Sequence, residues 1–114
     1  MRVLICGGRD YDNMLQFFEV MAAFARDYGD ITEVIHGDAK GADFLARLWA
    51  KYLYIPQTPF PADWNTHGKG AGHIRNQAML DTNPDAVIAF PGGRGTADMV
   101  SRSRNKGTFT VVVN

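Results

Sequence analysis

Short apolar runs alternate with longer amphipathic stretches along the whole chain. Compact runs rich in Val, Ile and other apolar residues predict strands at residues 3–6, 31–35, 85–90 and 108–113. Apolar residues spaced three and four apart predict helices at residues 14–28, 41–52, 71–80 and 96–105. Pro56, Pro59 and Pro61 make residues 54–61 a poor central strand, so we expect an edge strand or a loop there. The polar, Gly-rich segment 64–72 is expected to be a loop.

Strands that alternate with helices of this length are typical of βαβ units, which build parallel sheets through right-handed crossovers. We therefore expect an α/β fold, a single Rossmann-like three-layer domain over residues 1–114. Its sheet should be mainly parallel, with about five strands and with helices on both faces. In such sheets ligands bind beyond the carboxyl ends of the strands, where the strand order reverses. Three Gly-rich polar motifs follow the predicted strands and should meet at that edge.

Composition narrows the class of protein. The 12 basic and 12 acidic residues give a formal net charge of zero, which argues against binding nucleic acid or anionic membranes through bulk charge. No apolar stretch has the roughly 18 residues that a membrane span needs. The single cysteine, Cys6, excludes an internal disulfide framework, so a reducing, cytoplasmic location is expected. The three histidines lack metal-site spacing, so we predict neither a metal nor another cofactor.

The strongest motif lies between the strand predicted at 85–90 and the following helix. It reads Pro91-Gly92-Gly93-Arg94-Gly95-Thr96. Glycines let a backbone approach a ligand closely, and the free N–H groups at a helix start favour an anion. Arg94 and Thr96 add side-chain donors, so a phosphate is the expected occupant. The alternative is a tight turn with Thr96 as the helix cap.

A second motif, Gly7-Gly8-Arg9-Asp10, follows the first strand. It is neither the Gly-x-Gly-x-x-Gly dinucleotide fingerprint nor a P-loop. Arg9 is placed to meet a phosphate or carboxylate at the sheet edge. An ion pair of Arg9 with Asp10 or Asp38 is an equally good interpretation.

A third motif follows the second strand and contains Gly37, Asp38, Gly41 and Asp43. Acidic residues at strand ends accept hydrogen bonds from ribose hydroxyls in nucleotide sites, which makes Asp38 or Asp43 a candidate for that role. Asp43 is also explained as a first-turn acid that complements the helix dipole.

A fourth motif places Arg75 and Asn76 early on the helix predicted at 71–80, after the Gly-rich segment. An arginine followed by an amide suits recognition of a phosphate or sugar. Taken alone, the motif would favour a plain surface arginine.

In this order the four motifs resemble the SLOG superfamily, the Rossmann-like group that includes the Lonely Guy phosphoribohydrolases and the DprA fold. They look most similar to its small YspA/YpsA-related branch, which is common in bacteria and phages. The resemblance implies a nucleotide pocket at the carboxyl ends of the strands. Lonely Guy enzymes hydrolyse the N-glycosidic bond of a cytokinin ribotide with an arginine in an Arg-x-x-x-Met motif and the glutamate of Pro-Gly-Gly-x-Gly-Thr-x-x-Glu. Arg75 and Met79 match the first motif, whereas Met99 stands at the glutamate position and the nearest acid, Asp98, is one place earlier.

Three functional hypotheses follow. The first is a sensing or processing module that binds a nucleotide-like small molecule through the four motifs. The second is a nucleotide N-glycoside hydrolase in which Asp98 is the acid and Arg75 orients the phosphoribosyl group. One residue on a helix turns a side chain by about 100°, so the shift from position 99 to 98 favours binding over catalysis. The third is a partner-binding domain with a relic pocket. The aromatic-rich helix at 14–28 is the candidate interface for a homodimer or higher homo-oligomer.

Overall fold

A computed structural model describes all 114 residues of the chain. The elements follow one another in the order β1 (Arg2–Cys6), α1 (Met14–Tyr28), β2 (Glu33–His36), α2 (Ala42–Tyr52), β3 (Gln57–Pro59), α3 (Trp64–His67), the 3₁₀ helix η1 (Gly68–Gly70), α4 (Ala71–Leu80), β4 (Ala86–Ala89), α5 (Arg94–Lys106) and β5 (Phe109–Val112). The expected α/β alternation is confirmed. None of the helices has both the length and the apolar character that a membrane crossing requires.

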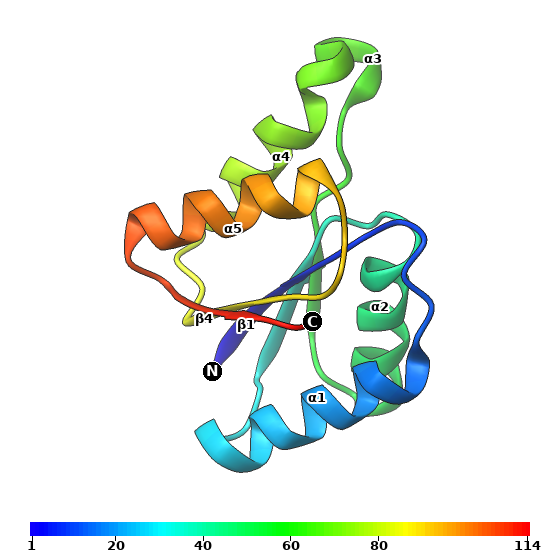
Figure 1. Cartoon of the computed structure of the whole chain (residues 1–114), viewed down its shortest axis with the longest axis vertical. Helices are drawn as coiled ribbons and strands as arrows, with labels where there is room; N and C mark the ends of the chain where they lie inside the picture. Colours follow the sequence, from blue (N-terminus) through cyan, green and yellow to red (C-terminus); the bar gives the residue numbers. More distant parts are fainter.

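The five strands form one sheet in the order β3-β2-β1-β4-β5, and every neighbouring pair is parallel. Helices α1 and α2 cover one face of this sheet and α4 and α5 cover the other, while α3 projects beyond the carboxyl ends of the strands (Figure 1). The chain runs outward from β1 to β3 and then returns to β4 on the other side of β1. The strand order therefore reverses between β1 and β4, the position at which Rossmann-like sheets bind ligands.

Successive residues of β1 alternate between two cores, because neighbouring side chains on a strand point to opposite faces. Val3 and Ile5 belong to the core beneath α1 and α2. Leu4 and Cys6 belong to the core beneath α4 and α5. Both faces of β1 are therefore covered, as its unbroken apolar sequence predicts.

The segment expected as a loop at residues 64–72 is the main correction to the predicted elements. It contains α3, η1 and the start of α4. The backbone N–H of Thr66 donates to Asp63 Oδ1 at 3.1 Å, which caps α3. Such a short, exposed turn carries no hydrophobic periodicity, so its pattern gave no signal. Of the edge strand or loop expected at residues 54–61, the structure shows an edge strand at residues 57–59. Helix α5 begins at Arg94 rather than at Thr96.

Candidate functional site

Three loops that follow β1, β2 and β4 pack against one another at the carboxyl edge of the sheet. The backbone N–H of Gly8 donates to Pro91 O at 2.9 Å, and the N–H of Ala42 donates to Gly8 O at 3.1 Å. A Cβ on Gly8 would lie 2.9 Å from Pro91 O, and a Cβ on Gly41 would lie 2.6 Å from the carbonyl carbon of Arg9. Gly41 also has a φ of 74°, which disfavours other residues. Gly8 and Gly41 therefore have a structural role, because they allow the loops to pack closely against one another.

Gly93 and Gly95 differ from those glycines because nothing lies within 4 Å of a Cβ added to either. Both line a cavity of about 320 Å³ between the carboxyl end of β1 and the first turns of α4 and α5, which we call the inner pocket. The inner pocket contains nine of the predicted site residues: Gly7, Gly8, Arg9, Asp43, Arg75, Asn76, Gly93, Gly95 and Thr96.

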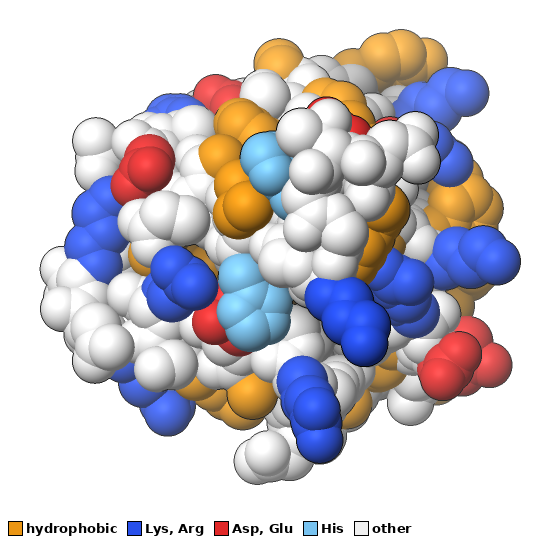
Figure 2. Space-filling view, turned by 90° about the horizontal axis from the view of Figure 1, so that it is seen from above, with side chains coloured by type: hydrophobic (Ala, Val, Ile, Leu, Met, Phe, Trp, Pro, Cys, Tyr) orange, Lys and Arg blue, Asp and Glu red, His pale blue; other side chains and the backbone are white.

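A larger cavity of about 810 Å³, the outer pocket, adjoins the inner pocket on the side of α2 and α3. The two share Arg9, Ala39, Trp64 and Arg75 as lining residues. Of the predicted residues, the outer pocket adds Asp10, Gly37, Asp38 and Gly41. The remaining four, Pro91, Gly92, Arg94 and Asp98, line neither cavity. On the face that carries α3, basic side chains predominate over acidic ones (Figure 2).

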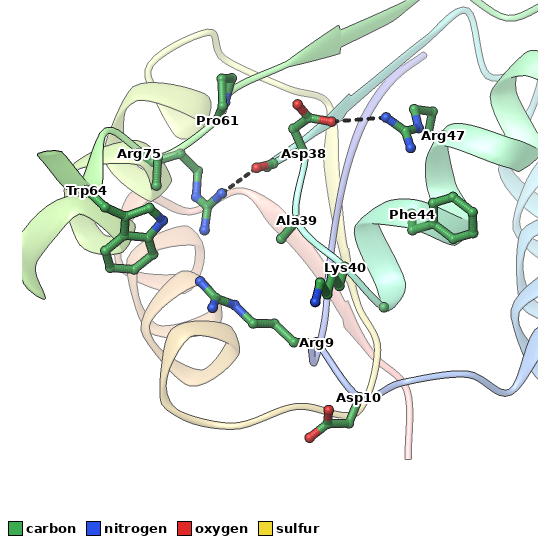
Figure 3. A pocket seen from close by; sticks show the side chains of 13 residues that line it. Arg9, Asp10, Asp38, Ala39, Lys40, Phe44, Arg47, Pro61, Trp64 and Arg75 are labelled. Atoms are coloured by element: carbon green, nitrogen blue, oxygen red, sulfur yellow. Dashed lines mark hydrogen bonds and ion pairs between the residues drawn. The ribbon is translucent and has the colours of Figure 1, made fainter.

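Two arginines from distant parts of the sequence meet where the pockets join. Arg9 and Arg75 point toward the same space beside Trp64 (Figure 3). The Arg9 guanidinium lies 5.3 Å from the centre of the Trp64 ring, a cation–π distance. Neither arginine forms an ion pair with a carboxylate within 4.0 Å, so the pair of Arg9 with Asp10 or Asp38 considered from the sequence is absent.

Arg75 is held by carbonyl groups alone. Its Nη1 donates to Gly37 O at 2.6 Å and to Phe60 O at 3.4 Å, whereas its buried Nε has no partner. Burial lowers the pKa of Arg75, the nearby Asp43 opposes this, and the positive charge of Arg9 lowers it further. A guanidinium with an unused donor and a second guanidinium nearby is an arrangement that an anion would stabilise.

Asp43 is the carboxylate of the inner pocket. The side chain is buried, with 6% of its surface exposed, and Oδ2 accepts from the backbone N–H of Ala39 at 3.3 Å. Burial raises the pKa of Asp43, while the Ala39 N–H and the charge of Arg75 act in the opposite direction. Cys6 lies next to it, and burial followed by the charge of Asp43 raises the pKa of Cys6 to about 12. The thiol is therefore protonated at neutral pH and is no nucleophile.

His36 positions the loop that follows β2, a role that the sequence did not reveal. Its Nδ1 accepts from the backbone N–H of Asp38 at 3.0 Å, and its Nε2 lies 2.8 Å from Gln57 Oε1. Because Nδ1 is an acceptor, the proton belongs on Nε2, which then donates to Gln57. Asp38 has a φ of 55°, a conformation unusual for a residue other than glycine. The fully buried His36 thus anchors a strained loop.

Asp98 does not line the inner pocket and belongs to the contact between α4 and α5. Its carboxylate accepts from Arg102 Nε at 2.8 Å and from Asn76 Nδ2 at 3.1 Å. Burial acts to raise the pKa of Asp98, but these hydrogen bonds outweigh it and the pKa is lowered. The neighbouring Met99 is fully buried in the core beneath α4 and α5.

Trp64 and Lys69 are lining residues that the sequence analysis did not select. Both lie on the segment that was expected to be a loop, so no pattern placed them at the sheet edge. The nearest signal was Trp64 itself, a large aromatic residue in an otherwise polar stretch. No group of three or more His, Cys, Asp or Glu residues is arranged to hold a metal ion.

Comparisons with known proteins relate the chain to one family. The model of the YspA, cpYpsA-related SLOG family matches residues 1–67, which include the loops after β1 and β2. The chain is also 34% identical over 115 residues to the Gene 61 protein of Mycobacterium phage D29, with 93% of this chain and 90% of that protein covered. The chain therefore belongs to the YspA/cpYpsA-related SLOG family.

Proposed function

We propose that the protein binds a nucleotide or a nucleotide-derived ligand, with a phosphate in the inner pocket. The observation that carries this proposal is the convergence of Arg9 and Arg75, both without a carboxylate partner, at the strand-order reversal. Burial lowers the pKa of Arg75, the nearby Asp43 raises it, and the positive charge of Arg9 lowers it again, so the two guanidinium groups repel one another. A bound phosphate removes this repulsion and accepts charge-assisted hydrogen bonds from the guanidinium groups.

The start of α5 supplies further donors to the same anion. The first helical hydrogen bond runs from Ala97 N–H to Gly93 O at 3.0 Å, and no side chain caps the helix. The N–H groups of Gly95 and Thr96 are therefore free for a ligand. The open space beside Gly93 and Gly95 allows an oxygen to approach them. Arg9 from the loop after β1, Arg75 from α4 and the amides of α5 together line this site.

Asp43 accounts for the sugar of the proposed ligand. An ionised carboxylate accepts hydrogen bonds only, and a ribose hydroxyl is a donor that fits it. Of the two acids considered from the sequence, Asp43 lines the inner pocket, while Asp38 lines the outer pocket. The inner volume of about 320 Å³ is near the lower end of ligand pockets, which run from roughly 300 to 1,000 Å³. A phosphoribosyl group is of this scale.

The geometry supports binding better than N-glycoside hydrolysis by Asp98. A general acid must be protonated and within reach of the bond that breaks. The lowered pKa of Asp98 keeps it ionised at neutral pH, and Arg102 and Asn76 both donate to its Oδ2. The position that carries glutamate in the Lonely Guy motif points into the core as Met99.

Calorimetric titration with nucleoside monophosphates tests the proposal. The wild type is expected to bind at least one of AMP, GMP, CMP and UMP. Arg9→Met and Arg75→Met should each weaken that binding by about 10- to 150-fold, because a charge-assisted hydrogen bond contributes roughly 1.5–3 kcal/mol. Arg26→Met is the matched control, since Arg26 is an exposed residue of α1 that lines neither pocket.

Two results would contradict the proposal. Absence of binding to every nucleotide in the panel would leave the partner-binding hypothesis as the better account. Equal affinity of the wild type and Arg75→Met would show that a ligand binds elsewhere. Urea unfolding of each variant establishes that any loss of binding does not come from loss of the fold.

A further inference from the structure

The outer pocket is larger than the inner pocket, and the proposed phosphate site does not use it. We infer that the ligand is a pyrophosphate-linked nucleotide conjugate, with its nucleoside half in the inner pocket and its distal half in the outer pocket. The inference rests on the proposed function, because the inner pocket must first bind the nucleotide. It deepens that function by naming the class of ligand.

The two pockets form a continuous path because Arg9 and Arg75 line both. Both arginines contact a single phosphate when the ligand is a monophosphate. Two guanidinium groups at the boundary match the two charges of a pyrophosphate, one for each phosphate. The pyrophosphate is then the link that passes from one cavity to the other.

The volume beyond this boundary calls for a substantial second group. The outer pocket measures about 810 Å³ against about 320 Å³ for the inner pocket. A phosphoribosyl group seated on Arg9, Arg75 and Asp43 fills the inner pocket and leaves the outer pocket free for a further group. A sugar or a second nucleoside attached to the distal phosphate has the right scale for it.

The charges of the outer pocket suit a hydroxyl-rich anionic conjugate. Four cationic side chains and two carboxylates line it: Arg9, Lys40, Arg47, Arg75, Asp10 and Asp38. Lys40 forms no ion pair, so its charge is available to the distal phosphate or its substituent. Asp38 is an acceptor for a sugar hydroxyl, in the same way that Asp43 serves the inner pocket.

Arg47 is already oriented along the wall of the outer pocket. Its guanidinium lies 5.4 Å from the centre of the Phe44 ring, and Nη1 donates to Asp38 Oδ1 at 3.4 Å (Figure 3). Phe44 is 42% exposed and Trp64, on the opposite wall, is 47% exposed. An arginine that is held before binding loses less side-chain entropy when it contacts a ligand. Exposed aromatic walls also provide apolar surface for a sugar or a base.

Paired titrations test the inference. The affinities of AMP and ADP-ribose, UMP and UDP-glucose, and GMP and GDP-mannose are measured for the wild type, Lys40→Gln, Arg47→Gln and the control Lys51→Gln. Lys51 is an exposed residue of α2 that lines neither pocket. In at least one pair the conjugate should bind the wild type about tenfold or more tightly than the monophosphate, as one additional charge-assisted contact implies.

The variants locate the distal half of the ligand. Lys40→Gln and Arg47→Gln should reduce the conjugate's advantage over the monophosphate, while their affinity for the monophosphate stays within about twofold of the wild type. Lys51→Gln should leave both affinities unchanged. A residue with a purely structural role would change both affinities by the same factor, so the ratio of the two affinities separates these cases.

The failure of this inference is distinguishable from the failure of the proposed function. Monophosphate binding without a tighter conjugate in any pair would overturn the inference and leave the inner site standing. A tighter conjugate whose advantage survives both Lys40→Gln and Arg47→Gln would place its distal half outside the outer pocket and overturn the inference as well. Absence of binding by all six nucleotides would refute the proposed function itself.

Discussion

Gly92, in the loop between β4 and α5, and Gly95, in the first turn of α5, should respond in opposite ways to the same substitution. A Cβ on Gly92 would collide with Thr96 Oγ1 and would lie 2.6 Å from Gly8 N and 3.0 Å from Gly8 Cα. A Cβ on Gly95 meets nothing within 4 Å and enters the inner pocket. Gly92→Ala therefore tests loop packing, and Gly95→Ala tests ligand approach.

The expected effect of Gly92→Ala is a large loss of stability. The two loop backbones must separate, which costs about 1–3 kcal/mol by analogy with overpacked cores. The hydrogen bond from Gly8 N–H to Pro91 O, now 2.9 Å long, contributes about 1 kcal/mol more when it is strained. Together these give a loss of roughly 2–4 kcal/mol in the free energy of unfolding.

Gly95→Ala should instead raise stability and weaken ligand binding. Alanine replaces a glycine within a helix, which stabilises it by about 0.5–1 kcal/mol. For a chain of this size that gain corresponds to an increase in melting temperature of roughly 2–6 °C. The added methyl group occupies the space beside the free N–H groups of α5, so nucleotide affinity should fall by about fivefold or more.

Urea unfolding and calorimetric titration of both variants measure these effects. A stability of Gly92→Ala within about 0.5 kcal/mol of the wild type, the range of ordinary surface substitutions, would refute the packing argument. A Gly95→Ala protein that keeps full nucleotide affinity would remove the start of α5 from the proposed phosphate site.

Two further predictions concern buried side chains. Met99→Glu places a glutamate at the position of the Lonely Guy glutamate. It should destabilise the fold by about 3 kcal/mol or more, because it buries a charge in the core beneath α4 and α5. A folded variant that releases free base from a ribotide would contradict this prediction. Burial raises the pKa of Asp43 above 3.8, so the folded chain keeps the carboxyl proton of Asp43 to a higher pH than the unfolded chain does. The folded chain therefore loses stability as the pH rises from 3.8 through the raised pKa. The stability of Asp43→Asn relative to the wild type should therefore increase from about pH 4 to pH 7 in urea unfolding, and a constant or falling difference would argue against a desolvated carboxylate.

Periodicity predicted the long elements of the fold well. The amphipathic pattern of residues 14–28 coincides with α1, and the apolar runs locate β1 and β4 in the middle of the sheet. The short helix α3 carries no such pattern, because four exposed residues bury no apolar face. Its position depends on the Asp63 cap and on contacts with the following helices, which a single sequence does not display.

The candidate site could be anticipated by position but not by orientation. Because parallel strands end at one edge of a sheet, the sequence alone predicts that Arg9, Asp43 and the start of α5 lie together. Arg94 was predicted to be a ligand-binding residue on the same grounds, but it lines neither pocket. The sequence also undervalued Arg75, whose importance comes from carbonyl partners contributed by Gly37 and Phe60. Such contacts depend on how α4 packs across the sheet edge.

A nuclear magnetic resonance titration with nucleoside monophosphates tests the phosphate site most directly. The proposal predicts saturable shifts of the backbone amides of Gly93, Gly95 and Thr96 and of the side-chain Nε signals of Arg9 and Arg75. All of these residues line the inner pocket, and Arg75 Nε has no hydrogen-bond partner. Absence of shifts at millimolar nucleotide, or saturable shifts confined to the exposed surface of α1, would contradict it.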